Sequence, residues 1–580
     1  MYGVSGPGNL FNPGALAGKE TEFTQYKKGD KPYPTNYHNF APSLGIAWSP
    51  KLGSGAVSKL LFGEAGQTVW RAGYSISYIQ PSIASFTGVF NANPGGFVNA
   101  TRNAGNGNLI TSGQTWPLLL RETSRLGPPS FQETPVYPLK GAISDQASIF
   151  DKNVRIPYVQ SWNISLQREI GKDMAIEFRY VGNFNLQNLT SFNLNERNFQ
   201  TNGFFEEFKL AQANLQANIA AGRGNTFSYF GPDTGTSPLP ITLAYFSGLP
   251  AAQAGDKSRY TSTNFTSTTF VNPLARHNPD PSTFALNLYN DPARRDNALK
   301  AGLPVNLFLV NPGLQDGASF TGNGGFNRYD SGVVEFRRRF SRGLLMQSSY
   351  TFAKGYDSQF ISLRKPRDRT PREIIAHTFR ANWIYELPFG AGKPLLGGKG
   401  LLDKFVGGWE WHGVARTQSG VPFSLGNVRL VGMTRKELQD SVKLRFDDAR
   451  KLVFILPQDI IDNTVRAFNV SATAPTGYSS RGAPTGRYIA PANSETCIQL
   501  YRGDCGFTDL VVHGTPFTRF DLSLVKKTRI KENVNVEFRA EFLNAFNHIN
   551  FTTNTFTQVG GFTSDDFGKI NTAYQDTANT

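Results

Sequence analysis

The sequence is poor in the residues that build metal sites and redox centres. Of its 580 residues, only two are cysteine and six are histidine. The histidines are scattered, without H-x3-H or HExxH spacing, whereas a metal site needs at least two ligands held together. A G-x-S-x-G elbow is missing too, and the stretch from Gly390 to Lys393 lacks the spacing of a phosphate-binding loop. We therefore expect no catalytic residue, no cofactor and no metal site, and we predict that the chain is not an enzyme.

The two cysteines, Cys497 and Cys505, lie eight residues apart in a polar stretch. C-x7-C is not a redox motif, and no second pair of cysteines or histidines completes a zinc site. We favour a small loop-closing disulfide, which implies an oxidising compartment. The alternative is two unpaired loop thiols.

Long apolar runs and charged residues are also scarce. No run of about 18 apolar residues is present, so no transmembrane helix is expected. Charged residues make up 18% of the chain, against about 25% in a typical soluble domain. Aromatics reach 13%, and Gly (58) and Pro (34) are abundant, which favours an all-β chain with many turns. The net charge of +15 is spread along the chain without a nucleic-acid-binding signature. It fits a polyanionic partner such as lipopolysaccharide better than nucleic acid.

Alternation of apolar and polar residues is the strongest pattern. Within Tyr158–Ile170, Trp162 and Ile164 fall on one face, and their neighbours Asn163 and Ser165 fall on the other. The same pattern recurs, and it predicts about ten long strands. These strands lie near residues 40–48, 68–78, 158–170, 174–181, 331–340, 344–352, 377–387, 409–416, 517–528 and 534–542.

The connections between these strands alternate in length. Short or medium connections alternate with very long ones, which cover residues 81–157, 182–330 and 426–516. Structureless loops of this size argue against a compact soluble domain and are typical of an outer-membrane barrel. A soluble β-sandwich also alternates, but its strands run about five or six residues. We therefore predict an antiparallel transmembrane β-barrel. Burial of Trp162, Phe178, Phe336 and Phe538 between two stacked sheets would contradict it.

Two segments inside the long connections have helical character. Phe204–Ala221 contains good helix formers with acids near its start. Residues 434–440 form a second, shorter candidate helix, with Thr434 as its N-cap. We expect these short helices to pack in an extracellular cap. The alternative is a mobile surface loop.

Several of these segments resemble the Oar-like group of TonB-dependent outer-membrane transporters. The most specific match is RAEFLNAFNHINF (539–551), which resembles the penultimate-strand signature of these barrels. The other matching segments are NFAPSLGIAW (39–48), TVWRAGYSISY (68–78), IPYVQSWNISLQREIG (156–171), SSYTFAKGYDS (348–358), ANWIYELPFGAGKP (381–394), GGWEWHGVARTQSGVPFS (407–424) and FDLSLVKKTRI (520–530). The resemblance implies an N-terminal regulatory-like domain, a plug and a 22-strand barrel in the whole protein.

The sequence also departs from that family. Residues 1–580 contain no recognisable plug or TonB box, and the chain starts without the pattern of a signal peptide. It ends in a polar stretch, 571–580, where the family has a final strand that ends in Phe. We therefore expect a single barrel region from an incomplete chain that lacks the plug, N-terminal strands and the last strand.

Charged residues on the polar face of the predicted strands are the candidate functional residues. The resemblance implies that they line the lumen, where they contact the plug or the ligand path. The alternative, which we favour, is a ladder of cross-strand ion pairs that neutralises charge in a wet lumen. The candidates are Glu335, Arg337, Arg339, Arg380, Glu386, Glu410, Arg416, Arg519, Glu537, Arg539 and Glu541.

The resemblance therefore implies a TonB-dependent receptor or transporter in the outer membrane of a Gram-negative bacterium, which captures a ligand and passes it across that membrane. The alternatives are a structural or adhesive outer-membrane protein and a passive porin. The expected partners are outer-membrane lipid, lipopolysaccharide, an unidentified ligand and, through a plug outside this chain, the TonB complex.

Overall fold

The computed structural model describes residues 2–5, 22–25, 27–31, 33, 35–50, 55, 63, 66–79, 83–91, 93–94, 119–125, 136–137, 139–140, 146–309, 317–363, 368–372, 374–397, 400–531, 534–551 and 561–570. The predictions about Met1 and the polar end 571–580 lie outside this part of the chain. Among the described residues, no helix has both the length and the apolar character needed to cross a membrane.

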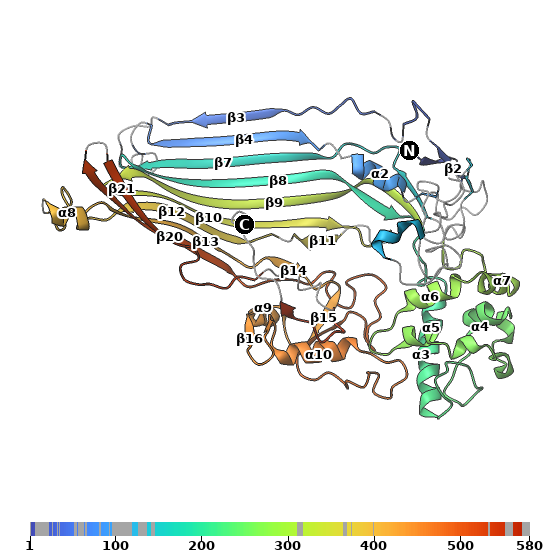
Figure 1. Ribbon diagram of the computed structural model, residues 1–580. Helices are drawn as coiled ribbons and strands as arrows, with labels where there is room; N and C mark the ends of the chain where they lie inside the picture. Colours follow the sequence, from blue (N-terminus) through green and yellow to red (C-terminus); the bar gives the residue numbers. More distant parts are fainter. Residues whose placement is uncertain are drawn as a thin grey trace.

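One large curved sheet dominates the structure (Figure 1). Ten of its strands pair antiparallel with their neighbours in chain order, so the ten predicted strands are confirmed. β11 (Asp368–Pro371) adds to β10, and β6 (Gln146–Phe150) adds to β9 in parallel. The ten strands are β3 (Ser43–Trp48), β4 (Thr68–Tyr78), β7 (Tyr158–Ile170), β8 (Met174–Asn193), β9 (Gly317–Ser341), β10 (Leu344–Gln359), β12 (His377–Glu386), β13 (Trp409–Gln418), β20 (Phe517–Lys531) and β21 (Val534–Phe542).

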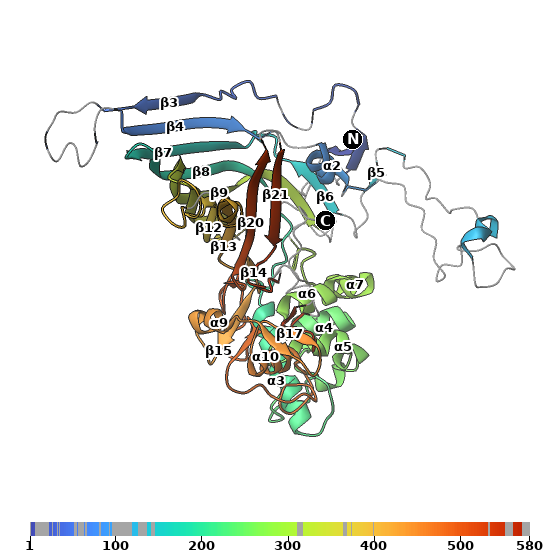
Figure 2. The ribbon, with the colours of Figure 1, turned by 60° about the vertical axis from the view of Figure 1, so that its left-hand side comes forward.

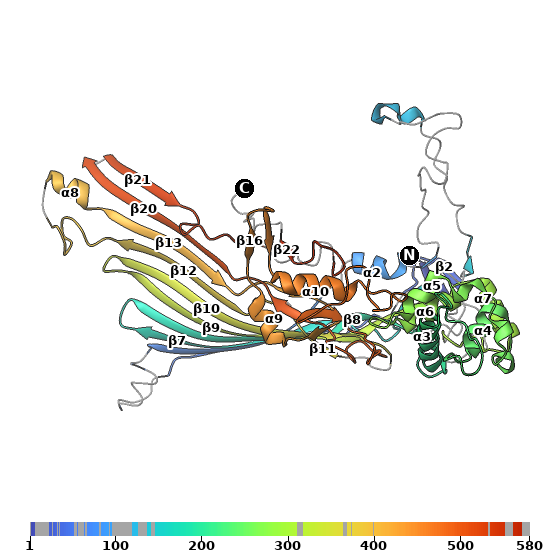
Figure 3. The ribbon, with the colours of Figure 1, turned by 90° about the horizontal axis from the view of Figure 1, so that it is seen from below.

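The sheet is open in the described part of the chain. Its pairing path runs from β3 at one edge to β21 at the other, without a hydrogen-bonded ladder between them. The view in Figure 3 shows how the strands curve between these two edges. β8 and β9 have 20 and 25 residues, so they extend well beyond the predicted strand ends at Val181 and Ser331.

The apolar side chains of the sheet form an exposed face. Phe178 is 47% exposed and Phe538 is 57% exposed, while Trp162 and Phe336 are half-buried. In the described part of the chain, no second sheet covers this face (Figure 2). The sandwich alternative is therefore wrong for this sheet, because its core would bury these four residues.

Two tryptophans of this face lie flat over glycines of the next strand. Trp162 is directly opposite Gly182, and Trp383 is directly opposite Gly413. A Cβ atom at either glycine would collide with the indole ring. The glycines therefore make room for the rings, which cover backbone that a glycine leaves bare.

The connection between β8 and β9 contains a folded unit, which we call the helical insert (residues 194–309). Its core is rich in phenylalanine rings, many of them packed edge to face, as for Phe208 and Phe284 with centroids 5.7 Å apart. Seven phenylalanines are less than 2% exposed: Phe204, Phe208, Phe227, Phe265, Phe270, Phe284 and Phe308. Its helices are α3 (Phe204–Ala220), α4 (Pro240–Ser247), α5 (Thr268–Val271), α6 (Pro281–Tyr289) and α7 (Pro292–Lys300), with 3-10 turns η2 (Ala251–Gln253), η3 (Lys257–Arg259), η4 (Thr263–Phe265) and η5 (Asn272–Leu274).

The connection between β13 and β20 contains a second folded unit, the mixed insert (residues 419–516). Phe567 and Ile570, near the end of the described chain, pack into its core, and β22 (Lys569–Ile570) pairs with β17. Its elements are β14 (Pro422–Ser424), β15 (Val428–Val431), α9 (Arg435–Ser441), β16 (Arg445–Asp447), β17 (Leu452–Phe454), α10 (Gln458–Phe468), β18 (Tyr488–Pro491) and β19 (Val511–His513). The other elements are β1 (Tyr2–Ser5), β2 (Glu22–Gln25), α2 (Ile83–Asn91), η1 (Leu120–Arg125), β5 (Leu139–Lys140) and α8 (Leu401–Val406).

The inserts confirm two predictions and correct a third. The predicted helices are α3 and α9, and Thr434 forms a capping box with Glu437 at the start of α9. The expectation of largely structureless connections is wrong for residues 194–309 and 419–516, because both segments bury cores of their own.

A buried carboxylate joins two helices of the helical insert. Glu207 of α3 is 5% exposed, and its two oxygens accept the N–H groups of Ile241 and Thr242, at 2.7 and 2.6 Å. Because Leu239 at the start of α4 has no capping side chain, Glu207 caps that helix from outside. Burial raises the pKa of Glu207 to about 7, although both N–H groups oppose this shift.

We predict that this carboxylate makes the stability of the helical insert depend on pH. Because the folded-state pKa is raised, folding takes up a proton. The stability that protonated Glu207 gives the folded insert is fully present below the ordinary pKa of a glutamate. It decreases as the pH rises from that value, and it is lost once the pH passes about 7. The free energy of unfolding should therefore fall by up to about 1.4 kcal/mol per pH unit in this window. Hydrogen exchange at the amides of α3 and α4, measured between pH 5 and 8, reports this change in the free energy of unfolding.

Glu207→Gln should flatten this pH dependence, because the amide does not titrate. Glu206→Gln is the matched control, since Glu206 lies on the exposed side of the same helix turn and pairs with Lys209. Equal pH dependence in the wild type and in Glu207→Gln would contradict the assignment.

We also predict that the two faces of the sheet respond differently to a new charge. Phe178→Arg places a cation on the apolar face and should lower the free energy of unfolding in lipid vesicles by about 2 to 4 kcal/mol. Asn163→Arg, on the polar face of the adjacent strand, should change it by less than about 0.5 kcal/mol. Urea titration followed by tryptophan fluorescence measures both, and equal losses would show that the apolar face does not contact lipid.

Candidate functional site

All eleven candidate residues lie on one face of the main sheet, which we call the polar face. The strand register shows this directly, because residues opposite each other on neighbouring strands point to the same side. One row across the sheet runs Glu177, Glu335, Ser349, Arg380, Arg416 and Arg519. The polar-face side chains of β21, Glu537, Arg539 and Glu541, follow from its register with β20.

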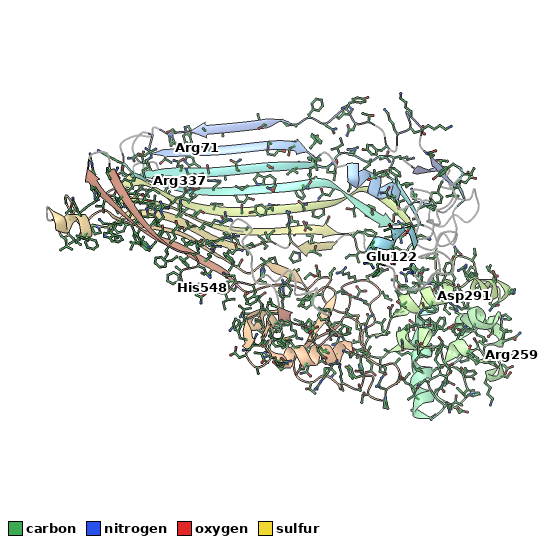
Figure 4. The ribbon with its side chains drawn as sticks, in the orientation of Figure 1. Arg71, Glu122, Arg259, Asp291, Arg337 and His548 are labelled. Carbon is green, nitrogen blue, oxygen red and sulfur yellow. A yellow bond between two sulfur atoms is a disulfide. The ribbon has the colours of Figure 1, made fainter. Side chains whose placement is uncertain are left out.

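The acidic part of this row belongs to a closed ion-pair network. Glu335 is 8% exposed. Its carboxylate accepts from Arg179 at 3.3 Å, from Arg337 at 2.5 Å and from Gln347 at 2.9 Å. Glu177 balances the second positive charge, because it pairs with both arginines, at 3.1 and 3.5 Å. The network therefore has no net charge. Figure 4 shows that Arg337 lies toward the end of the sheet remote from the inserts.

The basic part of the row consists of three arginines on three adjacent strands, which we call the arginine row: Arg380, Arg416 and Arg519. Arg416 donates to Gln418 at 2.9 Å and lies over the ring of Phe517. Arg519 pairs with Asp521 at 2.9 Å. Arg380 is exposed and makes no side-chain hydrogen bond or ion pair with any described residue.

Most of the remaining candidates are paired. Glu386 pairs with Lys393, and Glu410 pairs with Lys527 and His412, at 2.7 and 2.8 Å. On β21, Arg539 pairs with Glu537 at 3.0 Å and with Glu541 at 3.6 Å. Arg339 lies near the turn between β9 and β10, and its side chain has no partner among the described residues.

The strand register places the candidates on one face, but several of their partners lie outside the candidate set. The Glu335 network, for example, joins β9 to β8, whose Glu177 and Arg179 were not candidates. Eight partner residues were missed as candidates: Glu177, Arg179, Gln347, Lys393, His412, Gln418, Asp521 and Lys527. Alternation alone could have identified Glu177 and Arg179, because both oppose Phe178 in their strand.

The two inserts contact each other and form a joint cap, which lies on the side of the sheet opposite α8 (Figure 1). The ring of His277 stacks on Tyr478 with centroids 4.2 Å apart. Asn493 donates to the carbonyl of Pro279 at 2.7 Å. Within the mixed insert, Cys497 and Cys505 form a disulfide that closes a small loop. The carbonyl of Leu500 in this loop accepts a hydrogen bond from Gln200 of the helical insert.

The fold and the polar face define a class of protein. A long antiparallel meander with an exposed apolar face, a charged opposite face and long folded inserts on one side has the organisation of an outer-membrane barrel wall. The chain belongs to the family described as "Outer membrane beta barrel domain", which it matches over residues 2–578. The protein is therefore located in the outer membrane of a Gram-negative bacterium.

Comparison with solved structures finds distant similarity. The outer membrane transporter YddB from Escherichia coli is 8% identical, with 87% of this chain and 37% of that chain covered and a TM-score of 0.30. The ferripyoverdine receptor of Pseudomonas aeruginosa is 8% identical, with 95% and 34% covered and a TM-score of 0.29. The TodX monoaromatic hydrocarbon channel is 6% identical, with 94% and 72% covered and a TM-score of 0.17. The chain thus spans about a third of the length of the first two. A search of curated proteins finds no match.

We predict that the Glu335 network stabilises the sheet. Glu335→Ala leaves Arg179 and Arg337 without their shared carboxylate and should lower the free energy of unfolding by about 2 to 3 kcal/mol. Glu537→Ala removes an exposed pair on β21 and should cost less than about 1 kcal/mol. Urea unfolding in detergent micelles compares the two, and a Glu335→Ala loss no larger than the control would refute the structural role.

Proposed function

We propose that this chain is the barrel wall of an outer-membrane receptor or transporter, in which the polar face lines the ligand path and the cap captures ligand. The observation that carries this proposal is the polar face itself. A sheet that only anchored the protein would have no need of a face with so many ionised groups. Charged side chains are stable there because water reaches them, as it does inside a barrel lumen.

The cap supports a role in ligand capture. One insert has a phenylalanine-rich core, to which Ala472 of the other contributes, and the other has a largely aliphatic core. A side chain of each insert donates a hydrogen bond to a backbone carbonyl of the other, Arg276 to Pro475 and Asn493 to Pro279. A surface held in this way keeps its shape, and binding sites are commonly built from loops that a rigid scaffold positions. We infer that the cap presents a preformed surface to the cell exterior.

We further propose that transport is coupled to the TonB complex through a plug outside residues 1–580. This proposal rests on the sequence resemblance to TonB-dependent transporters, above all at RAEFLNAFNHINF. A structural or adhesive role and a passive porin are the competing functions, because both need a barrel and neither needs a plug.

We predict that the complete polypeptide encoded by the gene binds the soluble C-terminal domain of TonB. The same polypeptide in liposomes should not admit a small neutral sugar such as arabinose, because a plug closes the lumen. Surface plasmon resonance and liposome swelling measure the two properties. Rapid swelling without TonB binding would assign a porin, and neither swelling nor TonB binding would assign a structural or adhesive protein.

A further inference from the structure

A hollow of about 500 Å³ lies on the polar face beneath the mixed insert. Its wall comes from three neighbouring strands, β9, β10 and β12, and its rim comes from Val421 and Pro422, at the start of the mixed insert. The polar side chains that line it are Tyr329, Ser349, Thr351, Thr378 and Arg380.

These five polar side chains share one property. Within the described residues, none of their hydroxyl or guanidinium groups makes a side-chain hydrogen bond, an ion pair or a ring contact. The four hydroxyl-bearing side chains are half-buried and Arg380 is exposed, so their polar groups are available to a solute or to water. The contrast with the Glu335 network on the same face is direct, since every charged group there is paired.

Arg380 gives the hollow a positive charge, and no acidic side chain among the described residues lines it. Glu335 is the nearest acid in the row, beyond Ser349, but its carboxylate is already engaged by Arg179 and Arg337. Arg416 lies directly opposite Arg380 on the other side and adds positive charge. Like charges in register are destabilising, so an anion near Arg380 would relieve this repulsion.

We propose that the hollow binds an anionic, oxygen-rich group of a solute, namely a carboxylate, phosphate or sulfate. The guanidinium of Arg380 supplies a planar fork of donors that suits such groups. The hydroxyls of Ser349, Thr351 and Thr378 supply further donors around it. The inference rests on the proposed function, because it requires that the polar face be open to a solute.

Binding of citrate, inorganic phosphate and sulfate to the full chain in detergent, measured by equilibrium dialysis, tests the proposal. Sorbitol serves as an uncharged polyol. We expect saturable binding of at least one anion and none of sorbitol. Arg380→Gln should raise the dissociation constant at least tenfold, and Arg380→Lys should raise it less, because lysine keeps the charge but loses the fork. Thr378→Val should raise it about two- to fivefold.

Arg339→Gln is the matched control. Arg339 is also a polar-face arginine without a side-chain partner among the described residues, but it lies near the end of β9 and does not line the hollow, which β9 contacts at Tyr329. Its loss should leave anion binding unchanged. Heat-modifiable migration on gels verifies that each variant is folded. Equal losses in both arginine variants would overturn the proposal and show a diffuse electrostatic effect, and no saturable anion binding would also overturn it.

A second measurement separates this inference from the proposed function. The anion titration is repeated on the complete polypeptide, alongside TonB binding. Anion binding without TonB binding would keep the hollow and remove TonB-coupled transport. The complete polypeptide could instead bind TonB but no anion, while the 580-residue chain alone binds the anion. A carboxylate of the protein itself would then pair with Arg380, and the solute site would be overturned.

Discussion

The structure depends on one constraint, the hydrogen-bonded register of ten antiparallel strands. Each strand satisfies the backbone groups of the next, as a wall against lipid must, since lipid offers no hydrogen bonds. The same register fixes every side chain to one face, because a slip of one residue would exchange the faces. A slip in β9 would place Glu335 and Arg337 against lipid and Phe336 in the polar network. The apolar face, the ion pairs and the hollow all follow from this alignment.

The sequence predicted the strands well where the two faces have different surroundings. Tyr158–Ile170 was predicted with the observed bounds, because alternation is strong when one face meets lipid. The prediction ended β8 at Val181, whereas the strand continues to Asn193 with irregular register near Asn188. Gly182 interrupts the apolar pattern, which Phe184 and Leu186 resume, and the shift in register near Asn188 then breaks the two-residue period, because Leu189 no longer follows it.

The inserts show a different limit. α5 has only four residues and α7 has a single buried side chain, so neither has a periodic pattern to detect. The stability of the helical insert comes from contacts between residues that are distant in the sequence, such as Phe204 with Phe308. The cap on α4 comes from Glu207, which accepts a hydrogen bond from the N–H group of Thr242, 35 residues further along the sequence. Contacts of this kind depend on tertiary structure, and local propensity contains no information about them.

The candidate site was predictable as a face but not as a set of partners. Alternation assigns Glu335 and Arg380 to the same side, yet only the register shows that Ser349 separates them. It also shows that Arg179, 156 residues from Glu335, is the partner of that acid. The two halves of one row therefore have different physical characters. Where the acids Glu177 and Glu335 align, Arg179 and Arg337 pair with both of them, so the charges cancel and the sheet is stabilised. Where Arg380, Arg416 and Arg519 align, only Arg519 pairs with an acid among the described residues, and Arg380 and the hydroxyl groups of the hollow have no side-chain partner in this part of the chain.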